Sequence, residues 1–379
     1  QNIARSNPAT PLSAETGGKN AIILTASGDR DHAIMNIVAS AFGNAGQKCS
    51  ACSLLLVERS VYEDKNFQDK LKDAATSMKV GSVWNPGNVV GPMITNKNDK
   101  LLKALELEKG ESWLVPPRFL DKHKYVLAPT VKWGVRPGNY SFRTELFGPM
   151  LSVVCIENLQ QGIDLVNSLE YGLTSGLQSL DEGEQKLWKD SIMAGNLYIN
   201  RGITGAIVNR QPFGGMKLSA FGGGVKAGGP NYCACFVNIA DKPGSTTDYT
   251  QSYVKAYEQE FAHARDVNNL YGEQNAFRYL PLKNMVLRLF PGDNNEDAKM
   301  IALAARICHT PLSISFEPGD DRTAALASLG CPLKEEALAG FLKSMKNYER
   351  IRTCGADIPM EMYEEAARID KYIATAKPV

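Results

Sequence analysis

The chain has 379 residues, of which 44% are hydrophobic and 22% charged, and its formal net charge at pH 7 is +1. This length and apolar content suffice for more than one hydrophobic core, whereas a net charge this small argues against a nucleic-acid groove. The sequence shows no apolar run near the roughly 20 residues that span a bilayer, no secretory signal, and cysteines scattered as in a reducing cytosol, so we expect a cytoplasmic protein.

The first predicted feature along the chain is an acidic residue in front of two glycines. Glu15 begins the segment Glu15–Lys19, in which Gly17 and Gly18 follow one after the other. A glutamate in such a place is commonly a turn or helix-cap residue. An apolar pattern of helical period over 31–42 then predicts a helix that leads into a turn of small residues.

That turn contains Cys49, which lies 34 positions after Glu15. Small residues on both sides, among them Gly46, leave room for a substrate and a flat cofactor ring, and Lys48 places positive charge nearby. Two other interpretations stay open, because a cysteine among small residues is often a buried apolar residue. Cys49 and Cys52 also form a Cys-x-x-Cys pair, although no second pair at metal-ligand spacing accompanies it.

The combination of Cys49 and Glu15 predicts covalent oxidation of an aldehyde. A thiolate attacks a carbonyl carbon, and the resulting thiohemiacetal becomes a thioester when a hydride leaves. Water must then hydrolyse the thioester, and a carboxylate nearby activates that water as a general base. We therefore assign Cys49 as the nucleophile and Glu15 as the base. The four histidines are isolated from one another in sequence, so we expect no metal site.

Beyond Cys49 the pattern alternates between helices and strands. Such alternation predicts an α/β domain with a parallel sheet and covering helices. The segments read as strands or extended are 53–57, 113–114, 131–135, 151–156 and 196–200, and those read as helices are 61–78 and 159–168.

Five segments of the chain, in one order, resemble motifs of the aldehyde dehydrogenase family. The resemblance implies that Glu145 holds the nicotinamide ribose, since a carboxylate accepts hydrogen bonds from vicinal hydroxyls. It also implies that Phe147 packs beside the nicotinamide ring, that Gly17 contributes to the cofactor site and that the cofactor is NAD. The five segments are Glu15–Lys19, Gly46–Cys49, Asn85–Ile94, Glu145–Pro149 and Pro212–Gly215.

Three later segments are similar to the branch of that family that oxidises L-glutamate γ-semialdehyde, also called Δ1-pyrroline-5-carboxylate dehydrogenase. By this resemblance Gly205, Ala206 and Ser50 bind the α-carboxylate of the substrate, and Phe213 forms an aromatic wall. Backbone N–H groups exposed by small residues suit a carboxylate. The alternatives are glycines that merely serve a turn and an aldehyde of another kind. The three segments are Asn200–Ala206, Asn209–Phe213 and Lys226–Tyr232.

The chain continues past the end of an ordinary aldehyde dehydrogenase. A polar stretch over 240–248 reads as a linker, and a strand at 284–290, a helix at 295–308 and a strand at 311–316 predict a Rossmann-like module. No Gly-x-Gly-x-x-Gly joins strand and helix, so we expect no second dinucleotide site. This arrangement resembles the bifunctional proline utilization A family, whose C-terminal module is a non-catalytic relative of the same fold and is thought of as a lid.

The resemblance gives the expected domains and partners. We expect the end of an NAD-binding domain at 1–17, a catalytic domain at 18–238, a linker or arm at 239–276 and a truncated C-terminal module at 277–379. Most of the cofactor domain is expected to precede Gln1, so these residues alone should have little activity. FAD is expected only in a proline dehydrogenase half outside the sequence, as is any peripheral membrane contact, and we expect a homo-oligomer. A non-catalytic scaffold and acyl transfer to coenzyme A remain alternatives.

Overall fold

The computed structural model describes residues 6, 7, 10, 12–207, 210–237, 249–320, 322–355 and 357–375. Contacts divide the chain into two compact units. The Cys49 unit comprises Glu15–Ile207 and Phe213–Ala220, and the C-terminal unit comprises Gln1–Ala14, Val208–Pro212 and Phe221–Val379. The domain limits expected at residues 17, 238 and 276 stay predictions, and the linker predicted at 240–248 lies outside the described residues.

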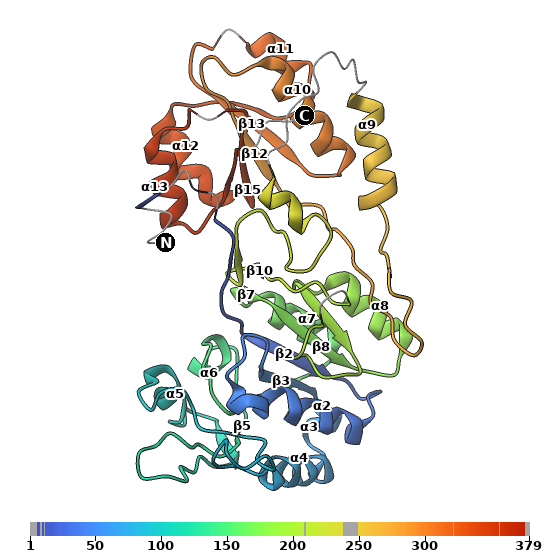
Figure 1. Ribbon diagram of the computed structural model, residues 1–379, viewed down its shortest axis with the longest axis vertical. Helices are drawn as coiled ribbons and strands as arrows, with labels where there is room; N and C mark the ends of the chain where they lie inside the picture. The colour runs from blue at the N-terminus through green and yellow to red at the C-terminus, as the bar shows by residue number, and fades with distance from the viewer. Residues whose placement is uncertain are drawn as a thin grey trace. The chain divides into compact units, whose positions relative to one another are not determined.

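The Cys49 unit is built on a seven-stranded sheet (Figure 1). Every neighbouring pair is parallel except β4 and β5, which are antiparallel. The α/β class predicted from alternating helices and strands is therefore confirmed. In sheet order the strands are β4 (Ser112–Val115), β5 (Thr130–Trp133), β6 (Met150–Ile156), β3 (Cys52–Glu58), β2 (Asn20–Leu24), β8 (Thr174–Gln178) and β9 (Asn196–Ile199).

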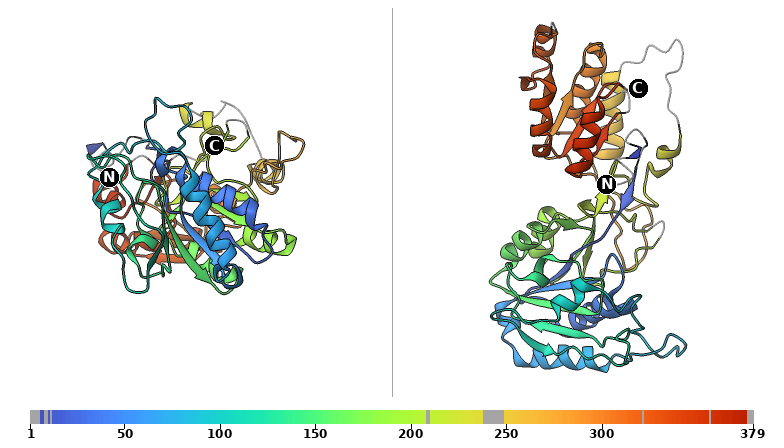
Figure 2. Two further views of the ribbon diagram at one scale, coloured as in Figure 1. Left: turned by 90° about the horizontal axis from the view of Figure 1, so that it is seen from below. Right: turned by 90° about the vertical axis from the view of Figure 1, so that its left-hand side faces the viewer.

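Helices cover both faces of this sheet, which is why its central strands are apolar without alternation. In β2, Ile22 and Leu24 join one core with α2 and α4, while Ala21 and Ile23 join the opposite core with α7 and α8. The two layers of helices are visible in Figures 1 and 2. The helices are α2 (Arg30–Phe42), α4 (Lys65–Ser77), α7 (Leu159–Asn167) and α8 (Glu182–Ser191).

The single helix predicted over 61–78 is wrong, because the structure has two helices there. α3 (Arg59–Tyr62) ends before α4 begins. Asp64 caps the start of α4, and its side chain accepts a hydrogen bond from the backbone N–H of Asn66 at 2.9 Å. A capping aspartate stabilises a helix start, and the periodicity of the apolar residues does not reveal such a break.

The C-terminal unit contains a second sheet of five parallel strands. The predicted succession of strand, helix and strand is confirmed by β12, α10 and β13. α10 and α11 pack on one face of the sheet and α12 and α13 on the other. In sheet order the strands are β14 (Leu333–Glu335), β13 (Leu312–Phe316), β12 (Met285–Arg288), β15 (Arg350–Thr353) and β16 (Ile373–Ala374), and the helices are α10 (Asn295–Ile307), α11 (Thr323–Ala327), α12 (Leu338–Ser344) and α13 (Met360–Arg368).

Arg288 is a fully buried cation at the end of β12. Its guanidinium donates hydrogen bonds of 2.8 Å to the Ser315 hydroxyl and to the backbone oxygen of Glu336. It also forms an ion pair with Glu317 and lies 5.1 Å from the ring centre of Phe341. A buried charge is tolerated when it is paired and hydrogen-bonded in this way.

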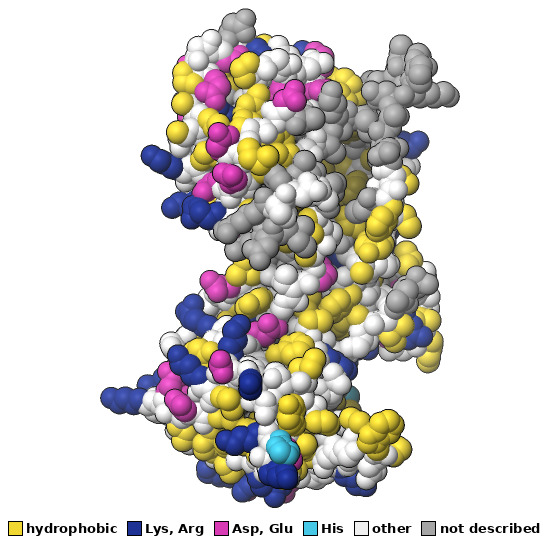
Figure 3. All heavy atoms as spheres, turned by 60° about the vertical axis from the view of Figure 1, so that its left-hand side comes forward, with side chains coloured by type: hydrophobic (Ala, Val, Ile, Leu, Met, Phe, Trp, Pro, Cys, Tyr) yellow, Lys and Arg dark blue, Asp and Glu magenta, His cyan; other side chains and the backbone are white. Residues whose placement is uncertain are grey.

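Charged side chains of both signs and apolar side chains are mixed on the face shown in Figure 3. Among the most exposed apolar residues are Trp84 and Ile94. Within the described parts of the chain, no helix is long and apolar enough to cross a membrane. The remaining elements are β1 (Ala14–Glu15), η1 (Gly43–Gly46), α5 (Asp99–Ala104), α6 (Tyr140–Arg143), β7 (Tyr171–Gly172), β10 (Met216–Lys217), β11 (Ala220–Phe221), η2 (Tyr232–Phe236), α9 (Tyr249–Ala256), η3 (Tyr257–Phe261) and η4 (Met345–Asn347).

Candidate active site

The turn between α2 and Cys49 has an unusual backbone. Asn44, Ala45 and Gly46 follow one another with φ angles of 56°, 54° and 65°, in the left-handed region that residues with a Cβ adopt at a cost. Gly46 also has no room for a side chain, since a Cβ there would lie 2.3 Å from the backbone oxygen of Gly148. The turn is therefore held tightly against the segment that contains Glu145.

Gly46→Ala should destabilise the Cys49 unit by about 2 to 4 kcal/mol, through left-handed strain and overlap with Gly148. Urea unfolding measures the change. Gly43→Ala is the matched control, because Gly43 has φ −54° and nothing within 4 Å of an added Cβ; its effect should stay within about 1 kcal/mol. Equal losses for the two variants would contradict the close approach seen at Gly46.

The base segment, Glu15–Lys19, lies against two other parts of the chain. These are the glycine-rich segment Pro212–Gly215 and the nucleophile turn, which runs from Gly43 to Cys49. The Glu15 carboxylate accepts a 3.1 Å hydrogen bond from the backbone N–H of Gly215, and Glu15 itself is exposed. A Cβ on Gly18 would lie 2.6 Å from the backbone oxygen of Cys49. The structure therefore brings together the two segments whose residues were assigned as base and nucleophile.

The Cys49 thiol is partly buried, and its surroundings favour the protonated form. Burial is the main cause that raises the pKa of Cys49, and the carboxylates of Glu145 and Glu15 raise it further. The backbone N–H groups of Ser50 and of Cys49 itself act against this rise in pKa, because they stabilise the thiolate. At neutral pH the resting thiol therefore keeps its proton, and attack on a carbonyl requires that proton to leave.

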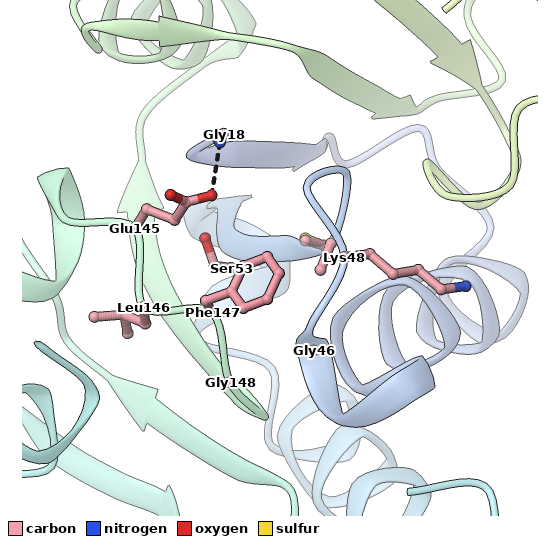
Figure 4. Close-up of a pocket in the computed structure, with 10 residues that line it drawn as sticks. Gly18, Gly46, Lys48, Ser53, Glu145, Leu146, Phe147 and Gly148 are labelled. Carbon is pink, nitrogen blue, oxygen red and sulfur yellow. Dashed lines mark hydrogen bonds between the residues drawn. The ribbon is translucent and has the colours of Figure 1, made fainter. Parts of the chain in front are cut away.

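The influence of Lys48 on Cys49 depends on the direction in which its ammonium points. In Figure 4 the Lys48 side chain extends away from Glu145 and the pocket beside it. A long lysine side chain is free to place its ammonium in solvent, and position in the sequence does not fix its direction.

The Glu145 carboxylate rests on the glycine pair of the base segment. Its Oε1 accepts a 2.7 Å hydrogen bond from the Gly18 N–H (Figure 4), and Oε2 would lie 2.1 Å from a Cβ on Gly17. Phe147 has φ 49° and is 41% exposed. The pocket between these residues and the nucleophile turn measures about 10 Å³, so a nicotinamide ribose would have to lie on its rim.

These residues fit the cofactor chemistry expected from the sequence. The half-buried Glu145 carboxylate has lone pairs that can accept a ribose hydroxyl, and the exposed Phe147 ring offers a surface for a flat heterocycle. Gly17 matters because only glycine lets the Glu145 carboxylate lie over the backbone. The cofactor roles of Glu145, Phe147 and Gly17 stay predictions.

Cys52, which lines this pocket, and Lys19 are both buried, and the Lys19 ammonium donates to the backbone oxygen of the pocket residue Ser53 at 3.4 Å. Burial lowers the pKa of Lys19 from its ordinary 10.5 to about 7, against the opposing influence of Cys52 and Glu145. Burial raises the pKa of Cys52 to about 12, which keeps it a neutral thiol. Cys49 and Cys52 are both free cysteines, and the residues that the structure describes include no group of three metal-binding side chains.

The buried Lys19 should make stability depend on pH. Between pH 7 and 10.5 the unfolded chain holds a proton at this lysine that the folded chain has released. The free energy of unfolding should therefore rise with pH by up to about 1.4 kcal/mol per unit, and below pH 7 this contribution becomes constant. Urea unfolding of wild type and Lys19→Met at pH 7, 8 and 9 isolates the effect, with Lys70→Met at an exposed lysine as control. Parallel curves for wild type and Lys19→Met would refute it.

The loop predicted to bind the substrate carboxylate is attached to α2. The backbone N–H of Ile203 donates to the Ser40 hydroxyl at 3.0 Å, which fixes the loop near the end of the helix that leads into the nucleophile turn. Gly205 is exposed, with φ 83° and nothing within 4 Å of an added Cβ, and Ala206 is half-buried. This open, glycine-bearing loop is suited to a small anion, and the assignment stays a prediction.

The two other predicted substrate residues have different environments. Ser50 is buried, and its backbone oxygen accepts a 3.3 Å hydrogen bond from the Thr174 hydroxyl. Phe213 is half-buried and precedes Gly214, whose N–H donates to the Asn196 side chain at 3.2 Å. Phe213 is therefore held two residues from the backbone partner of the Glu15 carboxylate.

Comparison with known proteins agrees with this geometry. A family model described as "Aldehyde dehydrogenase family" matches residues 1–241. The 1-pyrroline-5-carboxylate dehydrogenase of Bacillus subtilis (strain 168) is 35% identical over 221 residues, which make up 58% of this chain and 42% of that protein. The enzyme of the same name from Geobacillus sp. (strain WCH70) is 36% identical over the same shares. The chain thus spans less than half the length of these curated relatives.

Solved structures extend the likeness to the C-terminal unit. Proline Utilization A (PutA) from Corynebacterium freiburgense matches with a TM-score of 0.81 and 35% identity, over 99% of this chain and 38% of that one. A 1-pyrroline-5-carboxylate dehydrogenase from Thermus with bound NAD matches with a TM-score of 0.55 and 35% identity, over 60% and 43%. Because the family model spans well over half of the chain, the chain belongs to the aldehyde dehydrogenase family.

Proposed function

We propose that this chain carries the catalytic thiol and general base of an NAD-dependent L-glutamate γ-semialdehyde dehydrogenase. The observation that carries the proposal is the convergence of the Glu15, Cys49 and Glu145 segments, with glycines at each point of contact. Relatives named 1-pyrroline-5-carboxylate dehydrogenase support the choice of substrate.

The chemistry follows from the residues of the site. The Cys49 thiol releases its proton to solvent, and the thiolate forms a bond to the aldehyde carbon while the carbonyl π electrons move onto oxygen. The resulting thiohemiacetal oxyanion accepts hydrogen bonds from backbone N–H groups. When NAD is bound, it supplies the acceptor for the hydride that leaves this carbon. Glu15 then takes a proton from the water that attacks the thioester, and the acid departs while the thiol is restored.

The substrate's α-carboxylate is assigned to the loop at Gly205 and Ala206 with Ser50, and its aliphatic chain to Phe213. An anion at exposed backbone N–H groups is a common arrangement. The carboxylate should therefore distinguish L-glutamate γ-semialdehyde from simple aldehydes.

Protection of Cys49 from iodoacetamide tests this assignment without requiring turnover. Labelling is followed by mass spectrometry in the presence of L-glutamate γ-semialdehyde or of butanal, which lacks the carboxylate. The semialdehyde should protect Cys49 at a concentration about tenfold lower than butanal, as expected for one anion contact. Equal protection by the two would refute the carboxylate site, and absence of protection by either would refute Cys49 as the aldehyde-binding thiol.

The likeness over 99% of the chain to a proline utilization protein supports a wider context. We propose that the chain is part of a homo-oligomeric cytoplasmic enzyme that also oxidises proline with FAD, in a half outside these residues. The C-terminal unit, by the same proposal, is a non-catalytic module. Proline-dependent reduction of a dye by the complete gene product is the expected result, and a complete product without that activity would refute the bifunctional assignment.

A further inference from the structure

A buried asparagine lies directly behind the nucleophile. Asn20, at the start of β2, is 1% exposed. Its side-chain nitrogen donates to the backbone oxygen of Cys49 at 2.7 Å and to that of Ala51 at 3.0 Å. Its side-chain oxygen accepts from the backbone N–H of Thr174 at 3.0 Å.

Only an asparagine satisfies these contacts. The amide nitrogen offers two donors to two carbonyls, and the amide oxygen offers an acceptor to one N–H. An aspartate of the same shape would place an acceptor against two carbonyl oxygens. The opposite orientation of the amide would make all three contacts unfavourable, so the observed orientation is the one that the neighbours require.

The geometry of the peptide group connects this contact to the thiol. In a trans peptide the carbonyl and the N–H of one unit point in opposite directions. Asn20 holds the Cys49 carbonyl, so the Ser50 N–H of the same unit points away from Asn20, and this N–H is one of the two groups that stabilise the Cys49 thiolate. The Asn20 side chain therefore holds one side of the Cys49–Ser50 peptide, and the Ser50 N–H projects from the opposite side.

Thr174 supports the next carbonyl of the turn. Its hydroxyl donates to the backbone oxygen of Ser50 at 3.3 Å. Its backbone N–H donates to the side-chain oxygen of Asn20. Asn20 and Thr174 begin the neighbouring strands β2 and β8, so the sheet itself fixes the three carbonyls at Cys49, Ser50 and Ala51.

We propose that Asn20 is a positioning residue, which orients the Cys49–Ser50 peptide so that the Ser50 N–H stabilises the attacking sulfur, with Thr174 as a second support. The proposal rests on the proposed role of Cys49 as nucleophile. It assigns to Asn20 no contact with substrate or cofactor.

The test is the rate of Cys49 alkylation by iodoacetamide as a function of pH, measured by mass spectrometry on the complete chain. Neither substrate nor cofactor is needed. Asn20→Ala should slow alkylation at pH 7 about five- to tenfold and move the midpoint of the profile to higher pH, as expected for the loss of one hydrogen bond to the thiolate. The carboxylates of Glu15 and Glu145, which also face the thiol, are unchanged in this variant.

Asn167→Ala is the matched control. Asn167 also joins two segments, because it donates to the Ser191 oxygen at 2.9 Å and accepts from the Met193 N–H at 2.7 Å. If both variants lose stability but only Asn20→Ala shifts the pH profile, the positioning role is supported. A folded Asn20→Ala protein with the wild-type profile would overturn it and leave the role of Cys49 intact.

A second pair of variants keeps the test open if Asn20→Ala does not fold. Thr174→Val removes the hydroxyl that supports Ser50 and should slow alkylation about twofold to fivefold. Thr174→Ser keeps the hydroxyl and should restore the wild-type profile. Equal profiles for Thr174→Val and Thr174→Ser would count against the proposal. If aldehydes failed to protect Cys49 from iodoacetamide while Asn20→Ala still slowed its alkylation, the proposed function would be refuted and the positioning role of Asn20 would stand.

Discussion

Glu15→Gln should turn the proposed enzyme into one that reacts once and then stalls. Glutamine keeps an oxygen that accepts from the Gly215 N–H, but it takes no proton from water. Hydrolysis of the thioester should therefore slow by about 10² to 10⁴, while its formation continues. In the complete gene product, which we expect to include the cofactor domain, semialdehyde and NAD should give a burst of reduced cofactor. With p-nitrophenyl acetate, which acylates a thiol without any cofactor, we expect one equivalent of nitrophenolate per chain.

The control is Glu58→Gln, because Glu58 also accepts one backbone N–H, from Ala26 at 2.9 Å, and lies outside the site. It should turn over as wild type does. Steady turnover by Glu15→Gln would remove Glu15 from the base role. If coenzyme A rather than water released the acyl group of the wild-type protein, the chain would be an acyl transferase.

Cys49→Ala should abolish the chemistry altogether. Alanine offers no nucleophile, so aldehyde oxidation and the ester burst should both fall by at least about 10³. Cys155→Ala is the control, since Cys155 is another partly buried free cysteine and should leave both reactions unchanged. Residual turnover in Cys49→Ala above that level would mean that another group attacks the carbonyl.

The sequence was sufficient for most of the elements around the site. The helix predicted over 31–42 is α2 (Arg30–Phe42), and the strand predicted over 151–156 is β6 (Met150–Ile156). Both patterns are strong because these elements pack into extensive cores, where apolar spacing and secondary structure agree. The same applies to α10 (Asn295–Ile307), whose buried residues repeat at helical spacing.

Apolar patterns along the sequence do not predict which distant segments come into contact. The amide of Asn20 meets Thr174 across 154 positions, and neither residue carries a local signal of that pairing. The burial of Lys19 was equally hidden, because lysine is seldom fully buried. The left-handed φ of Ala45 depends on the neighbouring segment that closes on the turn, and alanine shows no preference for that conformation.

Arg288 favours one alignment of the strands in the C-terminal sheet. Its strand pairs with β13 so that Arg288 stands opposite Ser315, and the guanidinium finds its partners only in that alignment. A shift by one residue would move the charge to the other face of the sheet, into the core of Leu287 and Ile314, at a cost of several kcal/mol, since removing one partner of a buried ion pair costs about 3 to 5. The alignment of β12 with β13 should therefore be more stable than one shifted by a residue, and we expect Arg288 to help select it.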